Sequence, residues 1–252
     1  MYKTFEMELA GRPLKVDVGR VAKQANGAVL MHYGDTTVLC TATASEKPRD
    51  GIDFFPLSVE YEEKLYSVGK IPGGFNKREG KASENAILTS RVIDRPMRPL
   101  FDEELRNDTV VTCTVLANDY DNPVEIVASL GASIAIASSD VPWNGPVATT
   151  NVAHLNGKYI INPSADEREA CDCFVCISST FEKVVMIEAG AKEIPDEIMY
   201  EGIVKAHEEI KKQVAFINGI VAEIGKPKFE YEHADFNQEL FDDIVANFMD
   251  EA

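Results

Sequence analysis

Three arginines at helical spacing, Arg91, Arg95 and Arg98, are the residues of this 252-residue sequence best suited to binding a phosphate group. Positions i, i+4 and i+7 lie on one face of a helix, so the three side chains would form one cationic strip. The guanidinium group holds phosphate oxygens through two parallel hydrogen bonds, which a lysine cannot make. The pattern fits a phosphate-binding face. A solvated helix face, with Glu84 and Asp94 as local partners, fits it as well.

A glycine-rich loop precedes these arginines. Residues 66–82 contain four glycines and show no periodicity, and the centre of the segment combines Phe75 with Lys77 and Arg78. An aromatic face that stacks on bases, beside cations that meet backbone phosphates, is typical of sequence-tolerant binding of single-stranded nucleic acid. No Gly-Lys-Ser/Thr follows, so the loop is not a P-loop. The alternative is an ordinary exposed loop.

The distribution of charge restricts where a polyanion could bind. The chain carries a net charge of −17, and a uniformly acidic surface repels phosphate. Residues 70–100, however, hold seven Lys and Arg against three Asp and Glu, a local net charge of +4, which leaves −21 on the remainder. The composition thus disfavours a general nucleic-acid coat and allows one localised anion site.

The elements that must position these residues are predicted to be strands joined in hairpins, with a few helices between them. Alternating residues predict two hairpins in the first half of the chain, and Asn156-Gly157 predicts another in the second half. Ser83 caps a helix that we expect to end near Arg95, because Pro96 disturbs it. The expected strands are 4–9, 14–18, 28–32, 36–43, 53–61, 109–117, 147–155, 158–161, 171–178 and 183–188, and the expected longer helices are 123–138 and 196–224. This order indicates an α+β fold in two lobes.

The last part of the chain reads as a separate helical segment. Lys226-Pro227-Lys228 interrupts the chain, and Asp235 then caps apolar residues at helical spacing, beginning with Phe236. We expect one lobe over residues 1–145, a second over 146–228, and the start of a helical domain, cut short, over 229–252. The apolar residues of this segment have no helix to pack against before the sequence stops, which implies that the natural protein continues.

Cysteines and targeting signals point to a cytoplasmic protein without a metal site in this chain. Five cysteines at irregular spacing argue against a disulfide framework. Cys171, Cys173 and Cys176 could suggest zinc, but the apolar run around them favours a buried strand. The chain begins without a secretory signal, and its apolar runs are too short to cross a membrane.

Two strings within residues 69–101 closely resemble the first ribonuclease-PH-like core of the polynucleotide phosphorylase family. The strings are Gly69-Lys-Ile-Pro-Gly-Gly-Phe-Asn-Lys-Arg-Glu-Gly-Lys81 and Thr89-Ser-Arg-Val-Ile-Asp-Arg-Pro-Met-Arg-Pro-Leu-Phe101. Shorter matches are Asp53-Phe-Phe-Pro-Leu57, Gly131-Ala-Ser133 and Pro142-Trp-Asn-Gly-Pro146. The resemblance covers about residues 1–225. It implies a first lobe like domain 2 of ribosomal protein S5, a second α/β lobe, and a helical linker after them.

The resemblance also implies a function. The family degrades single-stranded RNA from its 3′ end with inorganic phosphate and releases nucleoside diphosphates; it forms homotrimers with a central channel and associates with components of RNA-degradation complexes. By this resemblance Arg91 and Arg95, with Arg98, would reach the RNA backbone near the active site. Phe75, Lys77 and Arg78 would line the channel, where the family commonly has Phe-Phe-Arg-Arg; here Asn76 and Lys77 replace one ring and one arginine.

The residues that would do the chemistry are missing from this chain. In the family, the second core holds Mg²⁺ on an Asp-x-Asp-Phe-Lys strand and phosphate at a Gly/Ser-rich helix N-terminus. The corresponding string here is Cys171-Asp-Cys-Phe-Val175, and the corresponding helix is preceded by Asn118-Asp-Tyr-Asp-Asn-Pro123, whose carboxylates would repel phosphate. No Ser-His-Asp or Cys-His arrangement is evident in their place.

The expected role is therefore a supporting core: it supplies arginines and a channel loop to an active site completed elsewhere. Two alternatives stay open. One is a non-catalytic RNA-binding or assembly subunit of the same fold. The other is an autonomous ribonuclease PH that trims transfer RNA, which the missing magnesium and phosphate residues disfavour.

Overall fold

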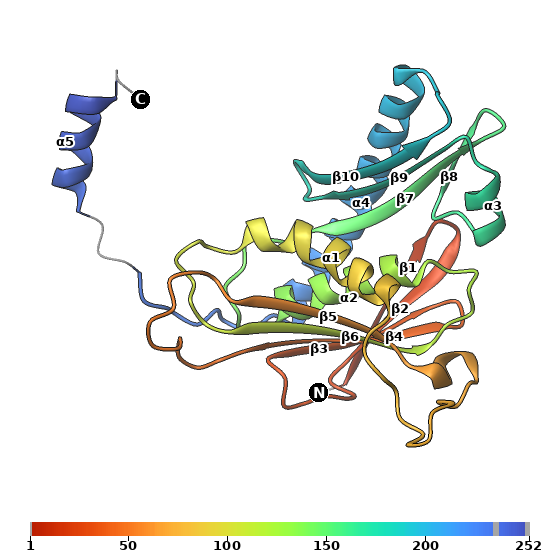
Figure 1. Ribbon diagram of the computed structural model, residues 1–252, viewed down its shortest axis with the longest axis horizontal. Coiled ribbons are helices and arrows are strands. Elements are labelled where there is room, and N and C mark those ends of the chain that lie inside the picture. Colours follow the sequence, from red (N-terminus) through yellow and green to blue (C-terminus); the bar gives the residue numbers. More distant parts are fainter. Residues whose placement is uncertain (1, 234–236, 250–252) are drawn as a thin grey trace.

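Two sheets form the framework of the protein in a computed structural model that describes residues 2–233 and 237–249 (Figure 1). The first sheet has six strands in the order β1-β2-β3-β4-β6-β5. Their bounds are Lys3–Leu9 (β1), Arg12–Val18 (β2), Gly27–Tyr33 (β3), Thr36–Ala44 (β4), Leu57–Glu63 (β5) and Thr109–Ala117 (β6). All neighbours are antiparallel except β5 and β6, which pair in parallel. A parallel pair needs a crossover connection, and helix α1 (Glu84–Met97) lies in it.

One face of this sheet is covered by α1 and by α2 (Val124–Ser138), as Figure 1 shows. Alternate residues of β2 to β4 point to that face and are fully buried, including Val16, Met31 and Cys40. Helix α2 lies very close to the sheet because Gly131 faces it: a Cβ there would come within 2.6 Å of Cys40 Sγ. The small residue at this position therefore allows the close spacing of the two layers.

The second sheet has four strands in the order β10-β9-β7-β8. Their bounds are Ala148–Leu155 (β7), Lys158–Ile161 (β8), Cys173–Ser179 (β9) and Val184–Ala191 (β10); helix α3 spans Ala165–Ala170 and helix α4 spans Asp196–Ile224. Helix α4 packs on β7 and β9 and also contacts α2, so the two lobes share one core. Buried hydroxyls join them: Ser129 and Ser178 each lie 2.8 Å from the hydroxyl of Thr149.

The predicted α+β fold in two lobes is confirmed, and the helix over 196–224 and the strand over 109–117 have the predicted bounds. Several other predicted limits were wrong by one to four residues, and two of these bear on the site. Helix α1 does not end at Arg95, because the buried ring of Pro96 is accommodated and the helix continues to Met97, followed by a 3₁₀ turn over Arg98–Leu100. The strand expected from residue 53 begins only at Leu57, after Pro56, which has no N–H to donate.

Helix α3 was missed, although the sequence carries a signal for it. Ser164 and Glu167 form a capping box, in which the Ser164 side chain accepts from the Glu167 N–H and the Glu167 side chain accepts from the Ser164 N–H. The helix has only six residues, too few to show apolar periodicity. The capping box was therefore the one usable signal.

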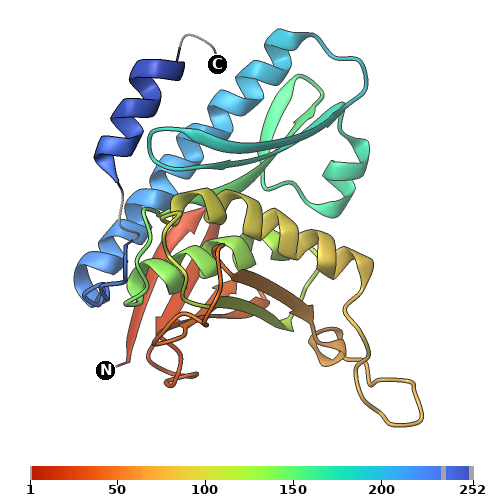
Figure 2. The ribbon, with the colours of Figure 1, turned by 60° about the vertical axis from the view of Figure 1, so that its left-hand side comes forward.

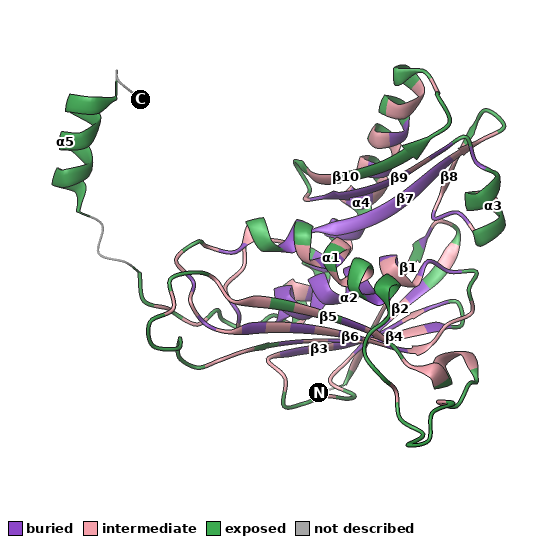
Figure 3. Ribbon diagram, viewed as in Figure 1, coloured by how far each residue is buried: buried purple, intermediate pink, exposed green. Residues whose placement is uncertain are grey.

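The segment after α4 returns to the first lobe. Lys228 donates to the carbonyls of Ala137 and Ser139 at the C-terminal end of α2, at 2.9 and 2.6 Å, and Phe229 N donates to Asp140 O. Helix α5 (Gln238–Phe248) follows, and none of its residues is buried (Figure 3). The predicted cap at Asp235 and the apolar residue Phe236 lie outside the described residues. The domain limits at 145 and 228 stay predictions.

No helix within the described residues is long and apolar enough to cross a membrane.

Candidate functional site

Helix α1 presents one buried and one exposed face, and the sequence fixes both. Ser83 begins the helix by accepting a hydrogen bond from the Ala86 N–H at 3.2 Å. Ala86, Ile93 and Met97, at helical spacing, are buried against the sheet. The opposite face, with Arg91, is left to solvent.

The three arginines of α1 differ in their surroundings. Arg91 and Arg95 are exposed, and neither has an ion pair or hydrogen-bonded side-chain partner among the described residues. Arg98, by contrast, forms a two-pronged pair with Asp94, the shorter distance being 2.6 Å, and donates to the carbonyl of Leu57 at 3.0 Å. The helix thus offers two arginines for a ligand, and the third is engaged in holding α1 to β5.

The glycine-rich loop leaves the first lobe as an extended excursion before α1 (Figure 2). Phe75 is 101% exposed, so its ring makes no packing contact that its removal would disturb. Lys77 adopts φ +51° in a turn closed by its N–H to Gly74 O at 3.0 Å, and Arg78 is exposed beside it. Arg91 follows the helix start by seven residues, which at 1.5 Å per residue places it about 10 Å along the helix.

Glu79 fixes the end of this loop to the body of the lobe. Its carboxylate accepts from the Leu65 N–H at 2.7 Å and pairs with Lys64 Nζ at 3.1 Å. The backbone hydrogen bond and then the lysine hold the pKa of Glu79 below its ordinary value. The loop is therefore anchored at its root and free at its tip.

The start of α2, where the resemblance would place a phosphate site, has the wrong charge for phosphate. A cavity of about 340 Å³ lies there, and Asp121, Glu125 and Glu169 are in its wall. Its one arginine, Arg168, pairs with Glu125 at 3.1 Å. Three carboxylates against one neutralised guanidinium disfavour an inorganic phosphate at this position.

Strand β9 likewise lacks the donors for a hard metal ion. Cys173 and Val175 are buried, at 3% and 1% exposure, whereas the Asp172 side chain is half exposed, with Oδ2 3.5 Å from His154 Nδ1. Magnesium requires oxygen ligands. A buried thiol and an isopropyl group do not supply them, and no cluster of three potential ligands occurs in the described part of the chain. Cys171, Cys173 and Cys176 are buried and form no disulfide.

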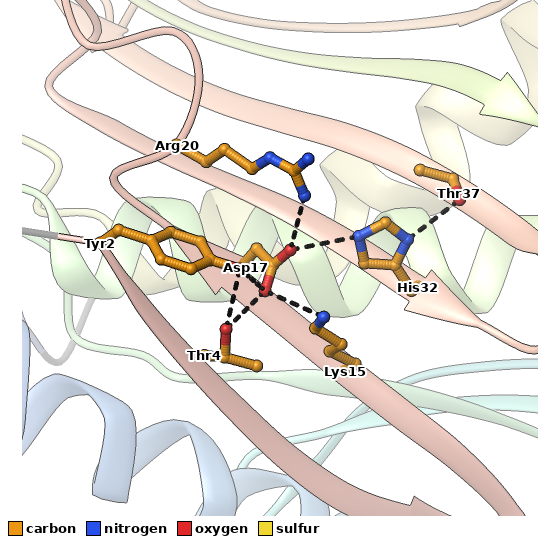
Figure 4. Close-up of polar contacts among 7 residues, drawn as sticks. All are labelled: Tyr2, Thr4, Lys15, Asp17, Arg20, His32 and Thr37. Carbon is orange, nitrogen blue, oxygen red and sulfur yellow. Dashed lines mark hydrogen bonds and ion pairs between the residues drawn. The ribbon is translucent and has the colours of Figure 1, made fainter.

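A polar cluster around Asp17, on the face of the first sheet opposite α1 and α2, was not foreseen (Figure 4). The buried Asp17 carboxylate accepts from Tyr2 at 2.9 Å and Thr4 at 2.8 Å. His32 lies between it and a threonine hydroxyl, with Nε2 3.5 Å from Asp17 Oδ2 and Nδ1 3.1 Å from Thr37 Oγ1.

The Asp17 cluster is best understood as a structural clamp. Burial by itself would raise the pKa of Asp17, but the hydrogen bonds from Thr4 and Tyr2, with Lys15 and His32, keep it below its ordinary value. A carboxylate with so many donors joins β1, β2 and β3. The available signal was the alternation of these strands, which puts Lys15 and Asp17 on one face and His32 directly opposite Lys15.

The sequence comparisons show which family of proteins has this two-lobed fold. Residues 10–142 match the 3′ exoribonuclease family, domain 1, and residues 145–209 match domain 2 of the same family. The chain therefore belongs to the 3′ exoribonuclease family.

Among individual relatives, the chain is 60% identical over 241 residues to the polyribonucleotide nucleotidyltransferase of Lachnoclostridium phytofermentans, covering 96% of this chain and 34% of that protein. It is 57% identical to that of Ruminiclostridium cellulolyticum, covering 98% and 35%, and 54% identical to that of Clostridioides difficile, covering 92% and 33%. These matches confirm the resemblance to the first core of these enzymes. The chain spans about a third of the length of these relatives.

A solved structure supports the fold alone. The crystal structure of rice (Oryza sativa) Rrp46 superimposes with a TM-score of 0.68 at 14% identity, covering 84% of this chain and 95% of that chain.

Proposed function

We propose that this chain is the RNA-gripping first core of a phosphorolytic 3′-to-5′ exoribonuclease, a polyribonucleotide nucleotidyltransferase. The observation that supports it best is the pairing of two unengaged arginines on α1, Arg91 and Arg95, with an anchored loop that exposes Phe75, Lys77 and Arg78. Because the rest of the chain is strongly acidic, RNA is attracted to this strip and repelled elsewhere.

In this proposal the two elements act at different points along the RNA. Phe75 stacks on a base and the cations beside it neutralise phosphates, which holds the strand in the central channel of a homotrimer. Arg91 and Arg95 hold the phosphates next to the terminal linkage. An oxygen of inorganic phosphate attacks the phosphorus of that linkage, the 3′ oxygen of the preceding nucleotide leaves, and a nucleoside diphosphate is released.

The Mg²⁺ and the inorganic phosphate belong outside this chain in the proposal, because Cys173 and Val175 offer no ligand and the start of α2 is lined by carboxylates. The chain's contribution is to bind and align RNA, so that attack occurs on an oriented linkage. We place the parent enzyme in the cytoplasm, with components of an RNA-degradation complex as partners.

The test is the release of nucleoside diphosphate from poly(A) in the presence of phosphate and Mg²⁺. The full-length protein should be active, and the 252-residue chain alone should be inactive. If the isolated chain turned over RNA at a rate near that of the full-length protein, the proposal that Mg²⁺ and inorganic phosphate bind outside this chain would be wrong. An inactive full-length protein would favour a non-catalytic RNA-binding or assembly subunit.

A further inference from the structure

A cavity of about 690 Å³ lies between the start of α1, the root of the glycine-rich loop and the carboxyl end of β5, and Tyr120, which follows the parallel strand β6, is also in its wall. It is separate from the exposed arginines and from the tip of the loop. Crevices at the carboxyl ends of parallel strands are common places for ligands, and this volume suits a drug-sized molecule. The residues that carry the argument are Tyr61, Lys70, Lys81, Ile87 and Tyr120.

One part of the wall is apolar and aromatic. Tyr61 is buried, and its hydroxyl donates to Glu63 at 2.7 Å, so the ring is held in a fixed position. Ile87 and Tyr120 are 50% and 64% exposed, although both side chains border the cavity. These groups provide a surface against which a flat ring can be buried.

The charged groups of the wall divide into engaged and unengaged ones. Lys64 pairs with Glu62 at 2.5 Å and with Glu79 at 3.1 Å, so its charge is engaged and the three groups together keep one negative charge. Lys70 and Lys81 have no ion pair among the described residues.

Glu60 and Glu63, on β5, also border the cavity, whereas the two lysines are carried by the glycine-rich loop. They disfavour an anionic group on the strand side. The loop side therefore offers two ammonium groups to an anion, while the base of the cavity offers apolar surface.

We propose that this cavity binds one nucleotide, with its base against Tyr61, Ile87 and Tyr120 and its phosphates at Lys70 and Lys81. A flat, weakly polar ring joined to a short polyanion is the ligand class that matches both halves of the wall. The nucleotide is either free or the terminal unit of an RNA. Since residues 79–82 form one wall, a bound nucleotide also fixes the root of the loop.

The proposal is tested by titrating the 252-residue chain with ADP in a calorimeter, without Mg²⁺. ADP should bind with one-to-one stoichiometry. Replacing both lysines, Lys70→Ala with Lys81→Ala, should weaken binding by about tenfold or more, since charge-assisted contacts are lost. Gly80→Trp should abolish binding, because a side chain at Gly80 meets open space at the cavity wall.

Gly219→Trp is the matched control, since Gly219 is exposed on α4 and also faces open space. Adenosine should bind more weakly than ADP, and so should pyrophosphate. Competition with tetra-adenylate distinguishes the two sources of the nucleotide. If tetra-adenylate binds more tightly than ADP and displaces it, the cavity binds the RNA terminus. If tetra-adenylate binds more weakly than ADP, the cavity binds free nucleotide.

The proposal fails if ADP does not bind up to about 1 mM. It also fails if the double lysine variant binds ADP like wild type, or if pyrophosphate binds as well as ADP, which would indicate a simple anion patch. Should Gly80→Trp be misfolded by circular dichroism, the exposed lysine variant decides alone.

Discussion

The loop offers the cleanest perturbation of RNA binding, because Phe75 and Lys77 contribute nothing visible to the stability of the fold. Phe75 is 101% exposed, and Lys77 has no ion pair in the described part of the chain. The double variant Phe75→Ala with Lys77→Ala should therefore leave the free energy of unfolding unchanged. Any effect on RNA then reports on binding itself.

The size of the effect follows from the groups removed. Stacking contributes about 1–3 kcal/mol per base, so KM for long RNA should rise roughly 5- to 150-fold in the full-length protein. Removing one cation that meets a phosphate should also reduce the slope of log K against log salt by about 0.7. The value of kcat on oligonucleotides too short to reach the loop should not change.

The assay is steady-state phosphorolysis of short and long oligoadenylates at several salt concentrations. Phe181→Ala is the matched control, since Phe181 is also exposed, at 53%, but lies outside the loop. An unchanged KM on long RNA together with an unchanged salt slope would show that the loop is ordinary surface. An equal loss of activity on short and long RNA would instead place the loop at the reacting end of the RNA.

Two further predictions concern the framework. Asp17→Asn should lower the free energy of unfolding at pH 7 by about 2–4 kcal/mol, because charge-assisted hydrogen bonds are lost. Since the pKa of Asp17 is lowered in the folded state, the stabilisation by its carboxylate is present above about pH 4 and is lost as the pH falls further. The free energy of unfolding, measured with urea between pH 7 and pH 2, should therefore depend less on pH in this variant than in the control Asp172→Asn. Gly131→Ala should destabilise by about 1–3 kcal/mol, because its Cβ would lie 2.6 Å from Cys40 Sγ. Gly219→Ala, at an open helix position, should not destabilise; equal thermal midpoints for the two alanine variants would argue against the close approach of α2.

Local patterns predicted much of the fold. Alternation placed most strands of the first sheet, β5 excepted, and the helix predicted over 196–224 has the bounds of α4. These signals are strong because a single buried face repeats over many residues. Helix α3 has no such face, and only its capping box at Ser164 marked it.

The site was predictable only in part. The helical spacing correctly put Arg91 and Arg95 on an exposed face, whereas the pairing of Arg98 with Asp94 depended on α1 continuing through Pro96. The Asp17 cluster could not be derived from local pattern, because it depends on the register of three strands. The roles of the arginines and the loop in RNA binding stay predictions.

The most direct test of the central claim is the kinetics of Arg91→Ala and Arg95→Ala in the full-length protein on short oligonucleotides. A phosphate contact that strengthens in the transition state contributes about 1.5–3 kcal/mol, so each variant should lose roughly tenfold or more in kcat. Arg78→Ala, in the loop, is the matched control and should leave kcat on short RNA unchanged. If Arg91→Ala and Arg95→Ala both turned over short RNA like wild type, the arginine face of α1 would be solvated surface and the proposed role of this chain would be contradicted.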